Sequence, residues 1–179
     1  DFDQNELAYL KSIGTDIDGI QVKEGEKSFF WSGKYHMDLN RRDTLVTDLN
    51  VLAAFDPILP DKYKTAEFLI LGNIDPTLQA KVIAQMIERP KLIAMDTMNF
   101  WMDIALDDLK EVLKKVDVLL VNDGEARQLS GEVSLVKAAR KIIEMGPKFL
   151  IIKKGEHGAL LFHENHVFFA PALPLEEVF

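Results

Sequence analysis

The sequence contains no cysteine among its 179 residues. Disulfides, thiolate metal sites and cysteine nucleophiles are therefore excluded, and the composition suits a reducing cytoplasm. Four histidines in the whole chain make a histidine-based zinc site an unattractive hypothesis. No apolar run approaches the length that a membrane-spanning helix needs. We therefore expect a cytoplasmic protein that has no membrane partner.

Positive charge is also scarce, because 21 Lys and Arg residues face 29 Asp and Glu residues. The net charge of −8 and the isoelectric point near 5.0 argue against a broad surface for nucleic acid or anionic membranes. A small basic pocket is still compatible with these numbers. Hydrophobic residues make up 47% of the chain, which is enough for one domain with a sizeable core.

Several familiar motifs are missing. The sequence has no G-x-x-x-x-G-K-[ST] phosphate loop, no G-x-G-x-x-G dinucleotide loop, no G-x-S-x-G and no H-E-x-x-H. The segment after Asp96 lacks the second aspartate of a D-x-D phosphatase. The common nucleotide, hydrolase and zinc-protease signatures are therefore not the basis of any function here.

The first part of the chain predicts a short helix over Asn5 to Ile13 and a β-hairpin within residues 17–51. In KSFFWSGKYH the residues alternate with period two, which is typical of a half-buried strand. The aromatic face carries Phe29, Trp31 and Tyr35, the polar face begins at Ser28, and Phe30 is the exception to the alternation. Because a lone hairpin is marginal in water, we expect its aromatic face to cover a ligand, the core or another subunit.

After residue 60 short apolar runs alternate with helical patterns. Strands are predicted at 67–73, 91–96, 117–122 and 148–153, followed by an antiparallel pair in ALLF and HVFFA. Helices are predicted in between, one capped by Asp75, one marked by Leu106 to Val116, and one capped by Ser134. Repeated β-α-β with nearly continuous apolar strands predicts an α/β fold, with a parallel, Rossmann-like sheet covered on both faces.

Polar residues and glycines follow each of these strands. They are Asn73 and Asp75 after the first, Asp96 and Asn99 after the second, Asn122, Asp123 and Glu125 after the third, and Lys153, Lys154 and Gly155 after the fourth. Because the carboxyl ends of parallel strands share one edge of a sheet, these side chains are predicted to converge there, where open α/β sheets bind ligands.

Each of these residues also has a purely structural interpretation. Asn122, Asp123 and Gly124 can form an ordinary turn, and Gly155 and Gly158 a tight hairpin. Asp96 and Asn99 are equally compatible with hydrogen bonds to substrate hydroxyls and with helix capping. Only the joint pattern indicates a binding edge, whose carboxylates would suit Mg²⁺ and whose lysine at a glycine turn would suit phosphate.

Three segments resemble the ribokinase-like, PfkB-type carbohydrate kinases. VNDGEARQLSG resembles the N-x-x-E segment of that family, with Asn122 and Glu125 in the motif positions. IIKKGEHGALLF resembles its G-x-x-G strand-turn-strand, with Gly155 and Gly158 matching and Lys153 at a position that is often Thr or Lys. The stretch 14–35 resembles the hairpin lid that closes over the sugar and often mediates dimerisation.

The resemblance implies an ATP-dependent phosphotransferase that acts on a hydroxyl of a sugar, nucleoside or related small alcohol. It implies ATP and Mg²⁺ as cofactors, Asn122 and Glu125 beside the metal, and Lys153, Gly155 and Gly158 at the nucleotide. The predicted substrate-binding residues are Ser28, Phe30, Asp96 and Asn99. The lid implies a homodimer. The alternatives are a non-catalytic nucleotide-binding or dimerisation domain and an unrelated α/β enzyme.

The sequence departs from the family pattern at both ends. It begins with Asp1, without the family's first strand and sugar-binding glycine pair, and it contains no G-A-G-D segment. We therefore expect a single kinase-like domain over residues 1–179 that is incomplete at both ends, with the general-base aspartate beyond Phe179. On that expectation the segment alone is a very poor kinase, and a normal turnover rate would contradict it.

Overall fold

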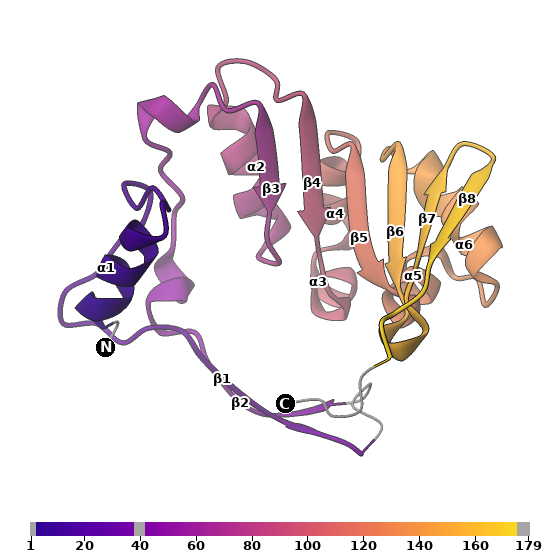
Figure 1. Cartoon of the computed structure of the whole chain (residues 1–179), viewed down its shortest axis with the longest axis horizontal. Helices are drawn as coiled ribbons and strands as arrows, with labels where there is room; N and C mark the ends of the chain where they lie inside the picture. Colours follow the sequence, from indigo (N-terminus) through magenta and orange to yellow (C-terminus); the bar gives the residue numbers. More distant parts are fainter. Residues whose placement is uncertain (1–2, 38–41, 175–179) are drawn as a thin grey trace. The chain divides into compact units, whose positions relative to one another are not determined.

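The computed structural model describes residues 3–37 and 42–174. The chain divides into two compact units, Asp1–Pro60 and Asp61–Phe179, and each is described by itself (Figure 1). None of the helices in the described residues has both the length and the hydropathy that crossing a bilayer requires.

The first unit begins with helix α1, Gln4–Ser12, close to its predicted position. The Asp3 carboxylate caps the helix by accepting a hydrogen bond from the backbone N–H of Asn5 at 2.8 Å. Gly14 follows the helix with a φ of +88°, a value that glycine adopts without a steric penalty. The predicted helix is therefore confirmed.

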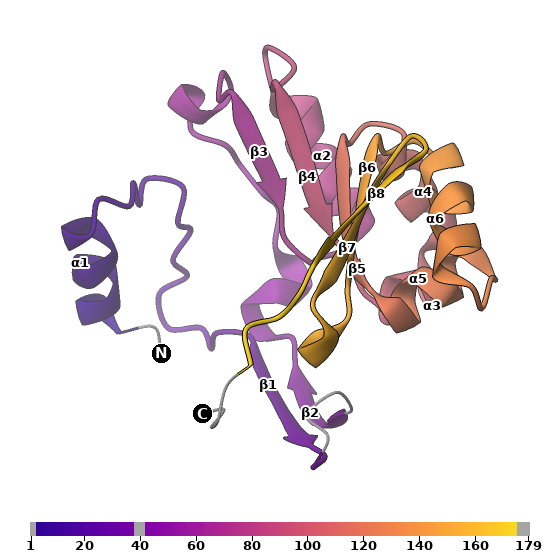
Figure 2. The same cartoon turned by 45° about the vertical axis from the view of Figure 1, so that its right-hand side comes forward.

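The predicted hairpin is confirmed as strands β1, Phe30–Tyr35, and β2, Arg42–Asp48, which pair antiparallel (Figure 2). The register shifts between Ser32 and Gly33, so Leu45 is an extra residue on β2 and forms a bulge. The Trp31 ring lies over Gly33, where an added Cβ would come within 2.2 Å of it. The bulge therefore interrupts the strict alternation expected from the sequence.

The second unit is built on a six-stranded sheet with the order β3-β4-β5-β6-β7-β8. Its strands are β3 Phe68–Leu71, β4 Leu92–Asp96, β5 Val118–Asn122, β6 Phe149–Lys153, β7 Ala159–His163 and β8 His166–Ala170. The first four pair in parallel and the last two pair antiparallel, as predicted.

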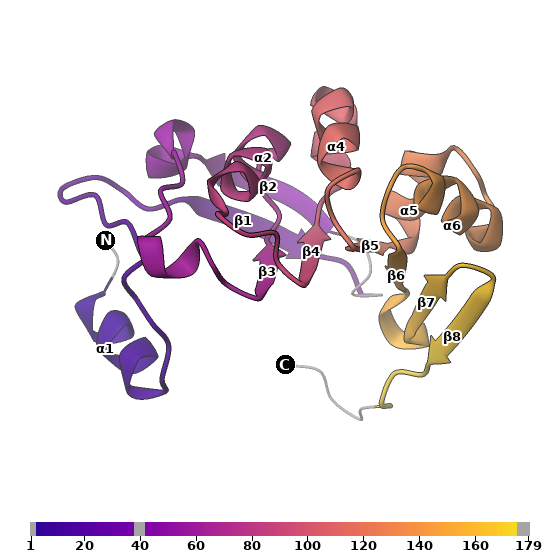
Figure 3. The same ribbon diagram turned by 90° about the horizontal axis from the view of Figure 1, so that it is seen from above.

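The helices of this unit are α2 Pro76–Gln85, α3 Asn99–Ile104, α4 Leu106–Leu113, α5 Asp123–Ser130 and α6 Leu135–Glu144. Short 3-10 turns occupy Asn50–Ala54 in the first unit and Asp61–Tyr63 and Gly155–His157 in the second. Figure 3 shows α2, α4, α5 and α6 on one side of the sheet. The parallel α/β architecture flanked by helices is therefore confirmed.

The core lies between the sheet and these helices. Alternate residues of the three central strands point into it and are fully buried: Ile93, Met95, Leu119, Val121, Leu150 and Ile152. The opposite face is also apolar, but Phe68, Ile70 and Phe168 are 64%, 80% and 64% exposed there. We expected helices to cover both faces of the sheet. In the described residues they cover one face, and the other face is exposed.

Three details differ from the sequence-based expectation. Helix α3 was not anticipated, and α4 ends at Leu113, before Val116. Ser134 precedes α6 at the predicted capping position but makes no side-chain capping bond. The last two differences lie at helix ends, where local patterns specify structure least well.

A buried carboxylate holds the amino ends of three strands together. The Asp117 side chain is 3% exposed and accepts hydrogen bonds from the Ile93 N–H at 3.0 Å, Lys148 Nζ at 3.0 Å and Arg89 at 2.9 Å. The Asp117 carbonyl oxygen accepts from the Lys148 and Phe149 N–H groups. Burial alone would raise the pKa of Asp117, but these donors outweigh it and hold the pKa below its usual range.

Replacing Asp117 by Asn keeps the shape but removes the charge that this network neutralises. We expect Asp117→Asn to lower the free energy of unfolding by about 3 kcal/mol at neutral pH, measured by urea unfolding. The exposed Asp108, in the first turn of helix α4, supplies the control, because Asp108→Asn removes only a helix-dipole interaction and should change stability by less than about 1 kcal/mol.

The pH dependence follows from the lowered pKa of Asp117. The stabilisation is complete above the unfolded-state pKa of about 3.9 and is lost as the pH falls through the lower folded-state pKa. The stability difference between wild type and Asp117→Asn should therefore be constant near neutrality and shrink in acid. A difference that grows on acidification would contradict this account.

The turn between β6 and β7 requires glycine at its end. Gly158 has a φ of +81°, and an added Cβ would lie 2.0 Å from the carbonyl oxygen of Ala170, at the end of β8. The N–H of Lys154 donates to the Gly158 carbonyl oxygen at 2.8 Å, which closes the turn. Position 158 therefore requires glycine for two reasons: its positive φ, and the lack of space for a Cβ beside β8.

Gly131 offers a matched control for this turn, because it also has a positive φ, +70°, but no atom within 4 Å of an added Cβ. We expect Gly131→Ala to cost about 1 kcal/mol for backbone strain alone. Gly158→Ala should cost clearly more, by at least about 2 kcal/mol, since strain and a backbone clash combine. Equal losses of thermal stability in the two variants would show that the close approach is unimportant.

Candidate functional site

The carboxyl ends of the central strands bring the predicted polar residues to one edge. Asp96 ends β4, Asn122 ends β5 and Lys153 ends β6. Asn122 pairs directly with Lys153 in the ladder, while Asp96 pairs with Leu120, two residues before Asn122. The side chains of all three lie on the same face of their strands. The prediction that these strand ends share an edge is confirmed.

Lys153 and Asp96 interact across the end of β5. Lys153 Nζ lies 3.6 Å from Asp96 Oδ1, and the two side chains are 49% and 41% exposed. An ion pair this open is weak, about 0 to 1 kcal/mol, because water screens it. The Lys153 ammonium is therefore held over the sheet edge by a partner that an incoming anion can replace.

Asn122 and Glu125 form a reciprocal cap at the start of α5. Asn122 Oδ1 accepts from the Glu125 N–H at 2.7 Å, and Glu125 Oε2 accepts from the Asn122 N–H at 2.7 Å. Glu125 is 7% exposed. Asn122 therefore begins a helix and is not part of an ordinary turn, so the turn interpretation is wrong. The arrangement is the capping box, which fixes the helix start rigidly against the sheet edge.

The start of α5 also presents backbone N–H groups at this edge, where a helix N-terminus favours anions. Two acidic residues in the first turn, Asp123 and Glu125, oppose that preference. Asp123 forms an ion pair with Arg127 one turn later, which offsets part of its charge. Among Asp96, Asn122 and Lys153, only Lys153 carries the positive charge that would neutralise an anion at this edge.

Gly155 and Gly158 bracket the 3-10 turn that follows Lys153. Gly155 has a φ of +56° and begins this turn. The sequence interpretation as a connection between two strands is correct, because β6 and β7 pair antiparallel on either side. The predicted role of both glycines at a nucleotide stays a prediction.

The capping interpretation of Asp96 and Asn99 is wrong. Met98 occupies the N-cap position of α3, without a side-chain bond. The Asp96 carboxylate accepts from the N–H of the adjacent Thr97 at 3.0 Å, and the Asn99 amide donates to Gln128 of α5. Their predicted role in holding substrate hydroxyls is not tested by these contacts.

Ser28 and Phe30 belong to the first unit. The Ser28 carbonyl oxygen accepts from Asn50 Nδ2 at 2.8 Å, which closes the base of the hairpin. Phe30 begins β1 and is 53% exposed. Both residues are at least partly exposed to solvent. Their substrate-binding role stays a prediction.

Two features of the edge were missed from the sequence. Gln79 of α2 is 1% exposed and donates to the carbonyl oxygens of Gly72 at 2.8 Å and Asp96 at 3.1 Å. The Trp101 indole N–H donates to Asn73 Oδ1 at 2.9 Å, which fastens α3 to the end of β3. A glutamine on an otherwise apolar helix face was the available signal for the first; nothing in the sequence indicated the second.

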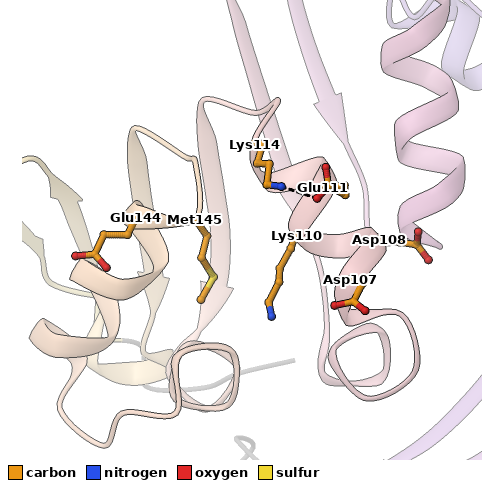
Figure 4. A pocket seen from close by; sticks show the side chains of 7 residues that line it. All are labelled: Asp107, Asp108, Lys110, Glu111, Lys114, Glu144 and Met145. Carbon is orange, nitrogen blue, oxygen red and sulfur yellow. Dashed lines mark hydrogen bonds and ion pairs between the residues drawn. The ribbon is translucent and has the colours of Figure 1, made fainter.

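A cavity of about 380 Å³ lies elsewhere, between α4 and the end of α6 (Figure 4). Its lining is charged and consists of Asp107, Asp108, Lys110, Glu111, Lys114, Glu144 and Met145. None of the residues predicted to bind ligand lines it. The strand-end edge, with its converging polar groups, is therefore the candidate site.

Solved structures with this fold are numerous. A protein described as ribokinase II from E. coli, solved with ATP and Mg²⁺, superposes with a TM-score of 0.78 at 21% identity, over 97% of this chain and 59% of that one. A nucleoside kinase from Burkholderia thailandensis, in complex with inosine, gives a TM-score of 0.73 at 18% identity, over 98% and 57%. These similarities establish the ribokinase-like fold.

Sequence comparison leads to the same group. The chain is 28% identical to the cytidine kinase of Thermococcus kodakarensis over 98% of its own length and 62% of that protein. It thus spans about three-fifths of the length of such relatives. The model of the pfkB family carbohydrate kinases matches residues 1–179. The chain therefore belongs to the pfkB family of carbohydrate kinases.

Proposed function

We propose that this chain carries the nucleotide-binding edge of a kinase that transfers the γ-phosphate of ATP to a hydroxyl of a sugar or nucleoside. The observation that carries the proposal is the convergence of Asp96, Asn122 and Lys153 at the carboxyl edge of the sheet. Phosphoryl transfer depends mainly on positioning and charge neutralisation, and a preformed row of strand ends provides both.

Lys153 is the residue that neutralises phosphate in this proposal. Its ammonium is half exposed, and its single ion pair in the described part of the chain is the weak one to Asp96. A phosphate oxygen is a stronger partner than a screened carboxylate, because charge-assisted hydrogen bonds to phosphate are short and strong. Lys153 would therefore exchange Asp96 for the nucleotide.

Magnesium would lie beside Asn122 and Glu125. The capping bonds engage the single side-chain oxygen of Asn122 and Oε2 of Glu125, and residues 3–37 and 42–174 contain no cluster of three acidic or histidine side chains able to hold a metal. This fits Mg²⁺, which keeps several waters and takes phosphate oxygens as ligands. Bound Mg²⁺ would supply charge neutralisation at the phosphate, and Asn122 and Glu125 would hold it through its waters.

The acceptor is proposed to be a sugar or nucleoside, supported by relatives named as cytidine, nucleoside and ribose kinases. Asp96 and Asn99 of the sheet edge would contact it. A substrate-binding role for Ser28 and Phe30 of the hairpin is a separate prediction for the first unit. The lack of cysteine agrees with a cytoplasmic location, which also stays a prediction.

The hairpin is further proposed to mediate a homodimer. Six large apolar residues in or beside its strands are 41% to 62% exposed, and a concentration of exposed apolar side chains favours an interaction surface. Sedimentation equilibrium of the natural protein should then give the mass of a dimer. A monomer at all concentrations would contradict this part of the proposal.

The decisive substitution is Lys153→Met in the natural protein. Loss of one charge-assisted contact of about 1.5 to 3 kcal/mol should weaken ATP binding by roughly ten- to a hundredfold. Adenosine binding should not change, because adenosine has no phosphate. Calorimetric titration with both ligands measures this difference, and ADP release in the presence of sugars and nucleosides tests the reaction.

Lys91 supplies the matched control, because it is exposed, precedes the opposite end of β4 and pairs with Glu67 at 2.6 Å. Lys91→Met should leave ATP affinity unchanged. Equal ATP affinity in wild type and Lys153→Met would exclude the phosphate role of Lys153. ATP binding without ADP release for any acceptor would favour the alternative, a non-catalytic nucleotide-binding or dimerisation domain.

A further inference from the structure

Gln79 is the one long polar side chain of α2 that is completely buried, among the residues the structure describes. It is 1% exposed, although it is polar. The other inward-facing side chains of the helix, such as Val82 and Ile83, are apolar and pack against the core. Burying a primary amide is unfavourable unless its groups are hydrogen-bonded. An apolar residue of similar length would fill the same space without that cost, so the amide needs a reason to be there.

The Gln79 amide joins β3 and β4 just beyond the last residue pair of their ladder. The last pair in that ladder is Leu71 with Met95. The next carbonyl oxygens, of Gly72 and Asp96, accept from Gln79 Nε2 at 2.8 and 3.1 Å. Both amide hydrogens are therefore used to hold the two strand ends together after the backbone ladder has stopped.

The second of these bonds reaches the candidate site directly. Asp96 is fixed through its carbonyl oxygen by Gln79, while its carboxylate accepts from the Thr97 N–H at 3.0 Å and lies 3.6 Å from Lys153 Nζ. Since the ion pair is too exposed to define its own geometry, the backbone of Asp96 sets where the carboxylate stands. The carboxylate in turn biases the Lys153 side chain toward the sheet edge, by no more than the weak ion pair allows.

Two buried acceptors flank the same strand end. Gln79 Oε1 and Thr97 Oγ1 have no hydrogen-bond partner in the described residues, although both side chains are at least 97% buried. Buried polar atoms are seldom left unpaired, and those that are call for an explanation other than packing. Leaving these two buried atoms unpaired is unfavourable. A purely structural contact between α2 and the sheet, made by apolar side chains, would avoid this cost.

We propose that Gln79 is a positioning residue, which fixes the end of β4 and thereby holds the Asp96 carboxylate where it directs Lys153 over the sheet edge. The proposal rests on the proposed function only in naming phosphate as the group that Lys153 meets. Gln79 itself touches no ligand and acts through Asp96.

The test substitution is Gln79→Met, which keeps the length of the side chain but removes both donors. The matched control is Gln85→Met, the same change at the other end of α2. There Gln85 Nε2 donates to the carbonyl oxygen of Lys81, within the same helix. In a crystal structure of Gln79→Met, the Lys153–Asp96 separation should open beyond ion-pair range, about 4 Å. It should be unchanged in Gln85→Met.

Ligand binding provides the functional measurement. Gln79→Met should weaken ATP binding about three- to fivefold and leave adenosine binding within about twofold, a selective loss of roughly 0.7 to 1 kcal/mol, which is the most that the Asp96–Lys153 pair can contribute. In the Gln79→Met/Lys153→Met double variant, the first change should add no further loss. A merely structural role predicts equal losses for ATP and adenosine, and additive effects.

The outcomes separate this proposal from the proposed function. If wild type binds ATP no better than adenosine, the phosphate role of Lys153 fails, while the crystal structure still decides whether Gln79 positions Asp96. An unchanged Lys153–Asp96 distance in Gln79→Met overturns the positioning role. Should Gln79→Met fail to fold, Gln79→Leu removes the same two donors in a more compact apolar side chain and is judged by the same distance.

Discussion

The candidate site depends on a carboxylate at the opposite end of the sheet. Asp117 ties the start of β5 to β4 through the Ile93 N–H, and to β6 through Lys148. In a parallel sheet, fixing the register at one end fixes it at the other, because the strands run side by side with the same rise per residue. The hydrogen bonds of Asp117 therefore help to align Asp96, Asn122 and Lys153, although these residues lie at the other end of the strands.

Rigid and exchangeable contacts are separated along this edge. The Asn122–Glu125 cap and the Gln79 amide are buried or reciprocal hydrogen bonds, so they hold the backbone in place. The Asp96–Lys153 pair is open to water and weak. A binding site benefits from this division, because the frame need not reorganise while one charged side chain changes partner.

Much of this arrangement could be read from the sequence. Apolar runs predicted the strands, and the rule that parallel strands end at a common edge predicted that Asp96, Asn122 and Lys153 converge. The N-x-x-E pattern is also that of a capping box, so the mutual cap was readable but was overlooked. Asp117 with Arg89 and Gln79 with Asp96 were not readable, since they join residues 28 and 17 positions apart that only the fold brings together.

The order of the strands has a consequence for how this unit acquires its structure. Every strand from β3 to β8 lies next to the one before it in the sequence. No strand must wait for a partner from a distant part of the chain, so each loop that closes is short and its entropic cost is modest. The sheet can grow strand by strand as the ribosome releases the polypeptide, and at every stage β3 and the newest strand form its two open edges.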